Sequence, residues 1–258
     1  MSSAGAEAGG RGLYARGKRF LVEGVGDSFD GLDLGAFVIV AVGCAGLLLS
    51  RYHGTVGAYH RYFRGAFRDW PLEPVYDHVY WFAASFVCYG LLPFLVVVLL
   101  KSEKLSEYGL GLGDWRLGLK VSGFFFVIMV PLVLYFAQTD AFRLTYPLDR
   151  DAVRSWSHFW LYEPGYWFYF VAWEFLFRGY LLFGLHKRMG NHAIWVQLMP
   201  FVLMHTGKPE VEAFASIIAG VALCVLALRT RSFWWGAFLH AAVAGFMDLT
   251  CALARIKS

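Results

Sequence analysis

Seven stretches of the chain are hydrophobic and are long enough, or nearly long enough, to cross a membrane. They lie at residues 34–50, 79–100, 121–139, 165–186, 193–207, 212–229 and 232–253. A helix needs about 20 residues to cross the hydrocarbon core of a bilayer. The stretches lack the alternating polarity of barrel strands, and lipid offers no partners to open backbone groups. The pattern therefore predicts an all-α, polytopic transmembrane helix bundle of about seven to eight helices.

The polar positions divide the chain into an N-terminal polar segment, residues 1–33, and a transmembrane domain, residues 34–258. The first segment contains Arg11, Arg16, Lys18 and Arg19. Acidic residues and a long polar stretch separate these basic residues from the first apolar run, which is not the pattern of a cleavable signal peptide.

The connections between the apolar stretches differ in length. Residues 51–78 and 140–164 form long connections that include aromatic residues suited to a membrane interface, so short helices at the membrane surface are compatible with them. The last four stretches are joined by very short turns at 190–192, 207–209 and 229–231. Short turns make consecutive helices antiparallel neighbours. The polar residues of the second half are therefore expected to lie close together.

Composition agrees with a membrane protein. Hydrophobic residues make up 58% of the chain and charged residues 16%, which is too apolar for an ordinary soluble domain. The net charge is +4 and the basic residues form no block, so a nucleic-acid partner is not indicated. Cys44, Cys88, Cys224 and Cys251 lie in or beside apolar stretches without CxxC spacing. This pattern favours core packing over a zinc site or a disulfide framework.

Titratable side chains are distributed unequally among the apolar stretches. Those of the first half contain no charged residue or histidine, whereas those of the second half contain Glu174, Arg178, His205 and His240. A charge at membrane depth costs about 2.5–3.5 kcal/mol on insertion scales, so such residues usually face the bundle interior and serve a function. Glu174 and Arg178 are four residues apart and would share one helix face as an ion pair. A pair that only holds helices together is the alternative.

The positions of the histidines and nearby carboxylates suggest roles. His205 is expected to close the fifth helix just before residues 207–209. Glu210 and Glu212 then fall in the first turn of the next helix, where the helix dipole stabilises carboxylates near the surface. His240 is expected about midway along the last helix, and a neutral imidazole with one internal hydrogen bond is its simpler interpretation.

In order and spacing, these segments resemble the CPBP family of intramembrane proteases, also called the Abi or CAAX-endopeptidase family. The family motifs are Glu-Glu-x-x-x-Arg, Phe-x-x-x-His and His-x-x-x-Asn/Asp, each on a separate membrane helix. The residues that match them are Glu174, Arg178, Phe201, His205 and His240. The resemblance covers about residues 105–250, including the segment 107–111 before the core. The sequence departs at Trp173, where the family has its first glutamate, and at Ala244, where it has Asn or Asp.

The resemblance implies glutamic-type peptide hydrolysis. Glu174 and His205 would orient and deprotonate a water molecule, His240 would stabilise the oxyanion, and Arg178 would position Glu174. Phe201 and Asp248 are the other supporting residues. Asp248 lies about 12 Å along the helix axis from His240 and could not share one water with it directly. The implied partner is a membrane-associated peptide or protein, such as a prenylated CAAX protein, a bacteriocin-like peptide or a C-terminal sorting signal.

Two alternatives stay open. Two histidines and a carboxylate can hold zinc or iron, but the His-Glu-x-x-His spacing of zinc proteases is absent, and the resemblance implies neither a metal nor another cofactor. The second alternative is a non-catalytic family member that binds a peptide as an immunity or maturation partner, which Trp173 and Ala244 favour. The expected location is the plasma membrane, as a multi-pass protein in the lipid bilayer.

Overall fold

The computed structural model describes residues 30–99 and 104–256, so most of the N-terminal polar segment, including Arg11, Arg16, Lys18 and Arg19, lies outside the described residues. The chain divides into a unit of residues 1–37 and a unit of residues 38–258. In the first unit, Asp33 Oδ1 accepts a hydrogen bond from the backbone N of Ala36 at 2.9 Å, which caps the start of a helix. The remaining description concerns the second unit.

Every regular element of residues 30–99 and 104–256 is helical, which confirms the all-α prediction. The α-helices are α3 (Leu34–His53), α4 (Val56–Phe63), α5 (Tyr76–Ser85), α6 (Leu92–Leu99), α7 (Trp115–Phe136), α8 (Asp140–Thr145), α9 (Trp156–Glu174), α10 (Phe183–Met189), α11 (His192–Leu203), α12 (Glu210–Thr230) and α13 (Trp234–Ile256). Short 3₁₀ segments are η2 (Glu73–Val75), η4 (Leu105–Tyr108) and η5 (Asp151–Val153). The π-helical segments η3 (Phe86–Leu91) and η6 (Phe175–Leu182) interrupt two long helices.

Within the described part of the chain, six helices are long and apolar enough to cross a membrane. They are Leu34–His53, Glu73–Leu99, Trp115–Phe136, Trp156–Met189, Glu210–Thr230 and Trp234–Leu253. The predicted stretch 193–207 is the shorter apolar helix α11, with 12 residues. The long connections contain the short helices α4 and α8.

Some helices begin earlier than hydrophobicity alone indicated. The stretch expected at 165–186 begins at Trp156, because the Ser155 side chain caps the helix by accepting a hydrogen bond from the backbone N of His158. The stretch expected at 121–139 begins at Trp115, where Asp114 accepts from the backbone N of Leu117 at 3.0 Å. Capping residues are polar, so a search for apolar runs leaves out the first turns of these helices.

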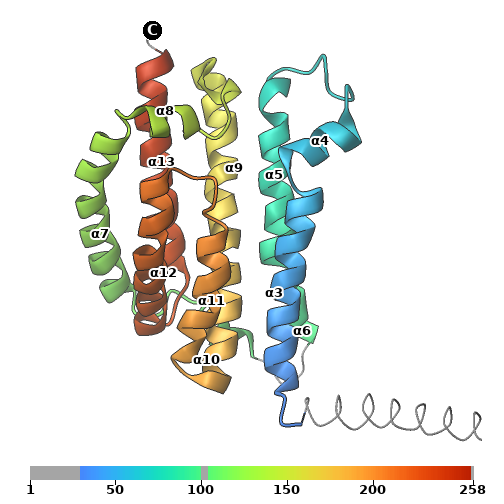
Figure 1. Ribbon diagram of the computed structural model, residues 1–258, viewed down its shortest axis with the longest axis vertical. Helices are drawn as coiled ribbons and strands as arrows, with labels where there is room; N and C mark the ends of the chain where they lie inside the picture. The colour runs from blue at the N-terminus through green and yellow to red at the C-terminus, as the bar shows by residue number, and fades with distance from the viewer. Residues whose placement is uncertain (1–29, 100–103, 257–258) are drawn as a thin grey trace, which may run out of the picture. The chain divides into compact units, whose positions relative to one another are not determined.

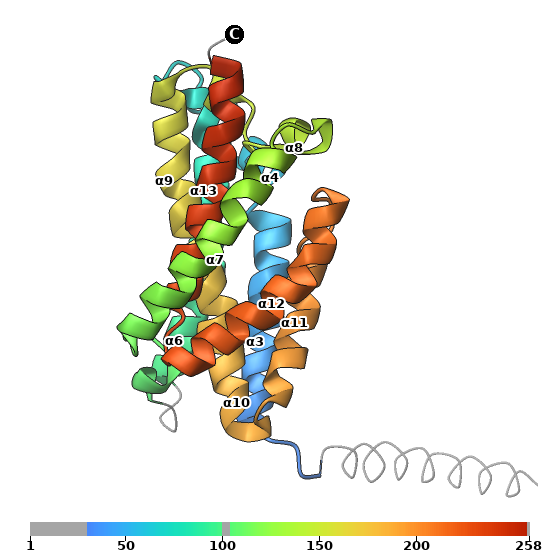
Figure 2. The same cartoon turned by 90° about the vertical axis from the view of Figure 1, so that its left-hand side faces the viewer.

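Short turns connect the consecutive helices α10, α11, α12 and α13 (Figures 1 and 2). Gly190, with φ +58°, ends α10, and Arg231, with φ +57°, follows α12. Helix α11 ends at Leu203, so His205 lies in the following turn rather than closing the helix. His240 lies in the second turn of α13, not midway along it as expected, because this helix begins at Trp234 and continues to Ile256.

The continuous helix formed by α9, η6 and α10 lies at the centre of the bundle, with α13 packed against α9 (Figure 1). In its most apolar window 78% of residues are buried, against 17% in α7. Its aromatic residues Tyr162, Tyr166, Tyr169 and Trp173 form successive ring contacts on one face. The central position of this helix therefore buries the Glu174 and Arg178 side chains inside the protein.

Candidate active site

Glu174 and Arg178 form a completely buried ion pair. Glu174 is the last residue of α9 and Arg178 lies in the π-helical segment η6. Arg178 Nη1 donates to Glu174 Oε1 at 2.9 Å, and both side chains have 0% exposure. Arg178 Nη2 also donates to the backbone O of Gly220 on α12 at 3.3 Å, and the ring of Phe201 lies 4.1 Å from the guanidinium carbon. Arg178 thus connects the central helix to α11 and α12.

The π-helical segment begins directly after the carboxylate. Such segments are rare and occur often at functional sites, because the extra residue in the turn changes the direction of neighbouring side chains. Here Phe175–Leu182 follows Glu174 and contains Arg178, and every residue of the segment is buried. The spacing of four residues still allows the predicted hydrogen bond between the two side chains.

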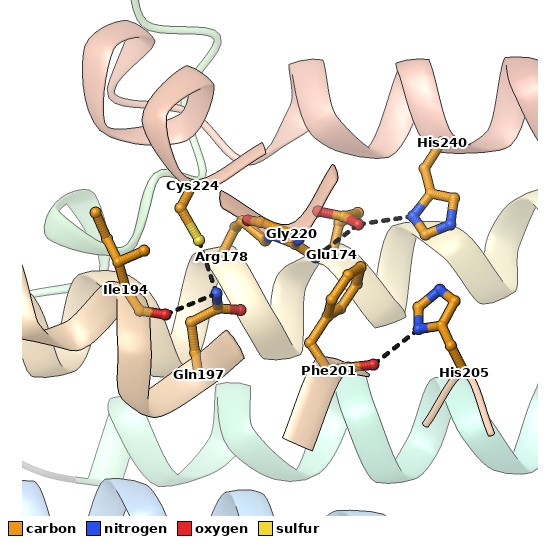
Figure 3. Close-up of polar contacts among 9 residues, drawn as sticks. All are labelled: Glu174, Arg178, Ile194, Gln197, Phe201, His205, Gly220, Cys224 and His240. Carbon is orange, nitrogen blue, oxygen red and sulfur yellow. Dashed lines mark hydrogen bonds and ion pairs between the residues drawn. The ribbon is translucent and has the colours of Figure 1, made fainter. Parts of the chain in front are cut away.

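His240 brings the last helix into the site. Its Nδ1 lies 2.8 Å from Glu174 Oε1 (Figure 3). Its ring packs on that of Phe170, with centroids 4.3 Å apart. Gly236, one turn earlier on α13, faces the carboxylate: a Cβ at this position would lie 3.0 Å from Glu174 Oε2. Glycine therefore allows α13 to approach the carboxylate closely. Glu174 Oε2 has no hydrogen-bond partner among the residues that the structure describes.

His205 lies opposite His240, and Figure 3 shows the two imidazole rings facing each other. His205 Nδ1 lies 2.8 Å from the backbone O of Phe201. A carbonyl oxygen only accepts hydrogen bonds, so Nδ1 bears the proton and Nε2 of the neutral ring has a free lone pair. Burial lowers the pKa of His205 to about 4, and the charges of His240, Lys208 and Arg178 act in the same direction. His205 is therefore neutral at pH 7, with the lone pair of Nε2 available.

Trp173 occupies the position of the first family glutamate. Its ring lies edge-on to His205, with centroids 5.9 Å apart, and contacts Phe177 and Phe201 at 5.0 and 6.0 Å. The side chain is only 4% exposed. Its Nε1 finds no hydrogen-bond acceptor within residues 30–99 and 104–256. The site thus has a buried indole ring against His205 where the motif of the resembling family has a carboxylate.

Asp248 lies in a separate polar cluster. It is completely buried, and its Oδ2 accepts a hydrogen bond from the Tyr162 hydroxyl at 3.1 Å. The structure therefore brings together five of the predicted residues, Glu174, Arg178, Phe201, His205 and His240, whereas Asp248 bonds elsewhere. Glu212 also forms a side-chain hydrogen bond outside the site: its Oε1 accepts one from the Tyr146 hydroxyl at 2.6 Å.

The sequence pattern did not reveal several residues that shape the site or are buried near it. Gly220 and Gly236 act through the backbone or through the lack of a side chain, which no polarity pattern shows. Gln197 is completely buried in α11, where its Nε2 donates to the backbone O of Ile194 at 3.1 Å and contacts Cys224 Sγ (Figure 3). The polar amide of Gln197 within the apolar stretch 193–207 could have indicated that this side chain is buried. Glu163 was assigned to a connection but is buried within α9.

One group of imidazole and carboxylate atoms in the described part of the chain is compact enough to hold a metal ion. It consists of Asp77, His78 and Asp149, not of the residues around Glu174.

One family model matches part of the chain. The family model described as Rce1-like, type II CAAX prenyl endopeptidase Rce1-like, matches residues 155–246. The CPBP resemblance is confirmed. The match includes all five converging residues and begins later than the expected core of about 105–250. At the family level it supports an intramembrane protease of the CAAX type, and with the six apolar helices it indicates a multi-pass membrane protein. No curated protein and no solved structure matches the chain.

Proposed function

We propose that this protein is an intramembrane endopeptidase that hydrolyses a peptide bond near the membrane boundary by glutamate- and histidine-assisted attack of water. The proposal rests on how the two carboxylate oxygens of Glu174 are hydrogen-bonded. Its Oε1 is held by Arg178 and His240, while Oε2 is buried and has no partner among the described residues. A carboxylate held in this way can orient a reactant without changing its own position.

In the proposed step, Glu174 Oε2 accepts a hydrogen bond from the water and His205 Nε2 takes the other proton. The water oxygen bonds to the substrate carbonyl carbon, which becomes a tetrahedral oxyanion. When the C–N bond breaks, the proton on His205 passes to the leaving amine, so His205 returns to its neutral form. General-base assistance of this kind contributes about 10²–10⁴-fold to a rate.

We propose that two N–H groups stabilise the oxyanion. His240 contacts Glu174 through Nδ1, which leaves its Nε2 as the nitrogen that can contact the oxyanion. The other donor is the buried Nε1–H of Trp173, whose ring contacts that of His205 and which has no acceptor among the described residues. In a site screened from water, one such donor is worth about 2.7–4 kcal/mol. Trp173 would thus compensate for the polar group that Ala244 lacks.

We propose a membrane-associated protein as the substrate, cut near its C-terminus, in line with the CAAX prenyl endopeptidase description of the matching family. A cavity of about 430 Å³ supports this choice, with Arg51, Tyr89 and Met204 in its walls. Met204 precedes His205, and the ring of Tyr89 lies 6.0 Å from that of Trp173. Arg51 gives the cavity a cation that suits the carboxylate at a chain end. The plasma membrane stays the predicted location.

The deciding experiment is cleavage of a prenylated CAAX peptide by the protein reconstituted in liposomes. We expect Glu174→Gln and His205→Ala to abolish cleavage, because each removes an acceptor for the water. Glu210→Gln is the matched control, since Glu210 is exposed in the first turn of α12. Unchanged cleavage in both site variants would contradict the proposed chemistry.

A non-catalytic peptide-binding role is the second candidate, and the two departures from the family motifs favour it. It predicts that the wild-type protein binds the peptide without cleaving it. Peptide binding that is measurable in liposomes, with no product by mass spectrometry after prolonged incubation, would select this role.

A further inference from the structure

A second group of titratable side chains lies away from Glu174. The helices α4 and α5 and the segment between α8 and α9 all lie in the upper part of Figure 1. His60 belongs to α4, Asp77 and His78 belong to the first turn of α5, and Asp149 precedes η5. Three separate parts of the chain therefore contribute two imidazoles and two carboxylates to one location.

Asp77, His78 and Asp149 form a compact set of ligand atoms, and His60 joins it through Asp77. Asp77 uses both oxygens: Oδ1 lies 2.7 Å from His78 Nδ1, and Oδ2 lies 3.2 Å from His60 Nε2. Asp149 Oδ2 lies 3.6 Å from His78 Nδ1. One ligand atom each from Asp77, His78 and Asp149 lies within 4.8 Å of the others. Around a tetrahedral zinc ion with bonds of about 2.0–2.1 Å, neighbouring ligand atoms are about 3.3 Å apart, so small movements would suffice.

Asp149 provides an independent indication that a cation can bind here. The residue is 3% exposed, and its Oδ1 accepts a hydrogen bond from the backbone N of Asp151 at 2.8 Å, which fixes the direction of the carboxylate. Its Oδ2 faces His78 but has no hydrogen-bond partner within the described ranges. Burial raises the pKa of Asp149 to about 6, although His78 lowers it. Leaving a buried acceptor unpaired is costly, and a bound cation would remove that cost.

We propose that His60, Asp77, His78 and Asp149 bind one divalent transition-metal ion, for which zinc is the best fit. Imidazole and carboxylate ligands suit zinc, and four protein ligands make a closed structural site. The His60 side chain is 59% exposed, which leaves the ion a path of entry. The rings of Tyr162 and Phe82 pack on His78 at 6.1 and 6.4 Å and hold it from the other side.

The ion would fasten α4 and α5 to the segment that leads into α9. Helix α9 is the helix that bears Glu174. Because a structural ion binds the folded protein and not the unfolded one, it adds RT ln(1 + [L]/Kd) to stability. This role is independent of the proposed peptide hydrolysis and requires no ion at Glu174.

The test is zinc titration of the full-length protein in detergent after removal of metals with a chelator. We expect one zinc per chain by calorimetry and a higher unfolding temperature with zinc than without. His78→Ala and Asp149→Asn should weaken binding at least about tenfold and abolish the thermal shift. His53→Ala and Asp140→Asn are matched controls, because both residues are exposed and outside the group. Helix content by circular dichroism verifies that each variant is folded.

Three outcomes would overturn the proposal. The first is the absence of stoichiometric zinc binding by the wild type. The second is equal zinc affinity in His78→Ala, Asp149→Asn and the wild type. The third is loss of binding in His240→Ala with retention in His78→Ala, which would assign the ion to the candidate active site.

Discussion

Trp173 lies edge-on to His205, with ring centroids 5.9 Å apart and ring planes at 81°. The family motif has a carboxylate at position 173, so an acceptor is replaced by an aromatic ring with one N–H donor. The neighbouring Glu174 remains as the carboxylate of the site, held by Arg178 and His240. In the mechanism that we propose, the departure from the motif changes which residue assists the water, and the imidazole of His205 is the proton acceptor.

Replacing Trp173 by Phe should lower kcat at least about tenfold and leave KM nearly unchanged. The change keeps an aromatic ring against His205 but removes the Nε1–H that we assign to the oxyanion, and such donors act mainly in the transition state. Steady-state kinetics with the reconstituted protein measures both constants. Trp167→Phe is the control, because Trp167 Nε1 donates to Glu163 Oε1 outside the site. A Trp173→Phe variant as fast as the wild type would leave the indole a packing role only.

Removing the charge of Glu174 should destabilise the protein as well as inactivate it. Glu174→Gln leaves Arg178 buried without its ionic partner, which typically costs about 3–5 kcal/mol. The double variant Glu174→Gln/Arg178→Met should regain part of the unfolding temperature but none of the activity. Thermal unfolding in detergent and peptide cleavage measure the two effects separately. If the double variant unfolds no later than the single one, the buried ion pair does not explain the loss of stability.

On the acid side of the pH–rate profile, kcat/KM should fall with a midpoint near pH 4. The reaction needs neutral His205, and burial lowers the pKa of this imidazole to about 4. Activity should be retained between pH 5 and 6, where an ordinary histidine of pKa about 6.5 is mostly protonated, and should fall as the pH falls through 4. The profile of kcat/KM in liposomes provides the check. A decline centred near pH 6.5 would show that His205 is not the buried neutral base.

Gly236→Ala should reduce activity by about tenfold or more. The added Cβ would lie 3.0 Å from Glu174 Oε2, so either the carboxylate or α13 must move, and a small misplacement of a reacting group is costly to the rate. Gly123→Ala is the matched control, since Gly123 is also helical and its added Cβ would meet no atom within 4 Å. Equal activity of the two variants and the wild type would place the acting oxygen away from α13.

Much of the fold could be predicted from local sequence. Runs of apolar residues predicted the long helices, since lipid requires the backbone to bond within each segment. The spacing of four residues predicted the Glu174–Arg178 pair, because neighbours on a helix face are three or four residues apart. Helix starts were placed less well, since the caps at Asp114 and Ser155 are polar residues outside the apolar runs.

The sequence by itself determined which polar side chains enter the bundle, through hydrophobicity and helical spacing, and these are properties of near neighbours. Only the tertiary structure decided their partners. His240 and Glu174, which contact each other, are 66 residues apart, and Asp248 accepts a hydrogen bond from Tyr162 across 86 residues. Asp149 contacts His78, although the two residues lie in different connections between apolar stretches. Such contacts depend on how whole helices pack, and the periodicity of a single segment does not contain that information.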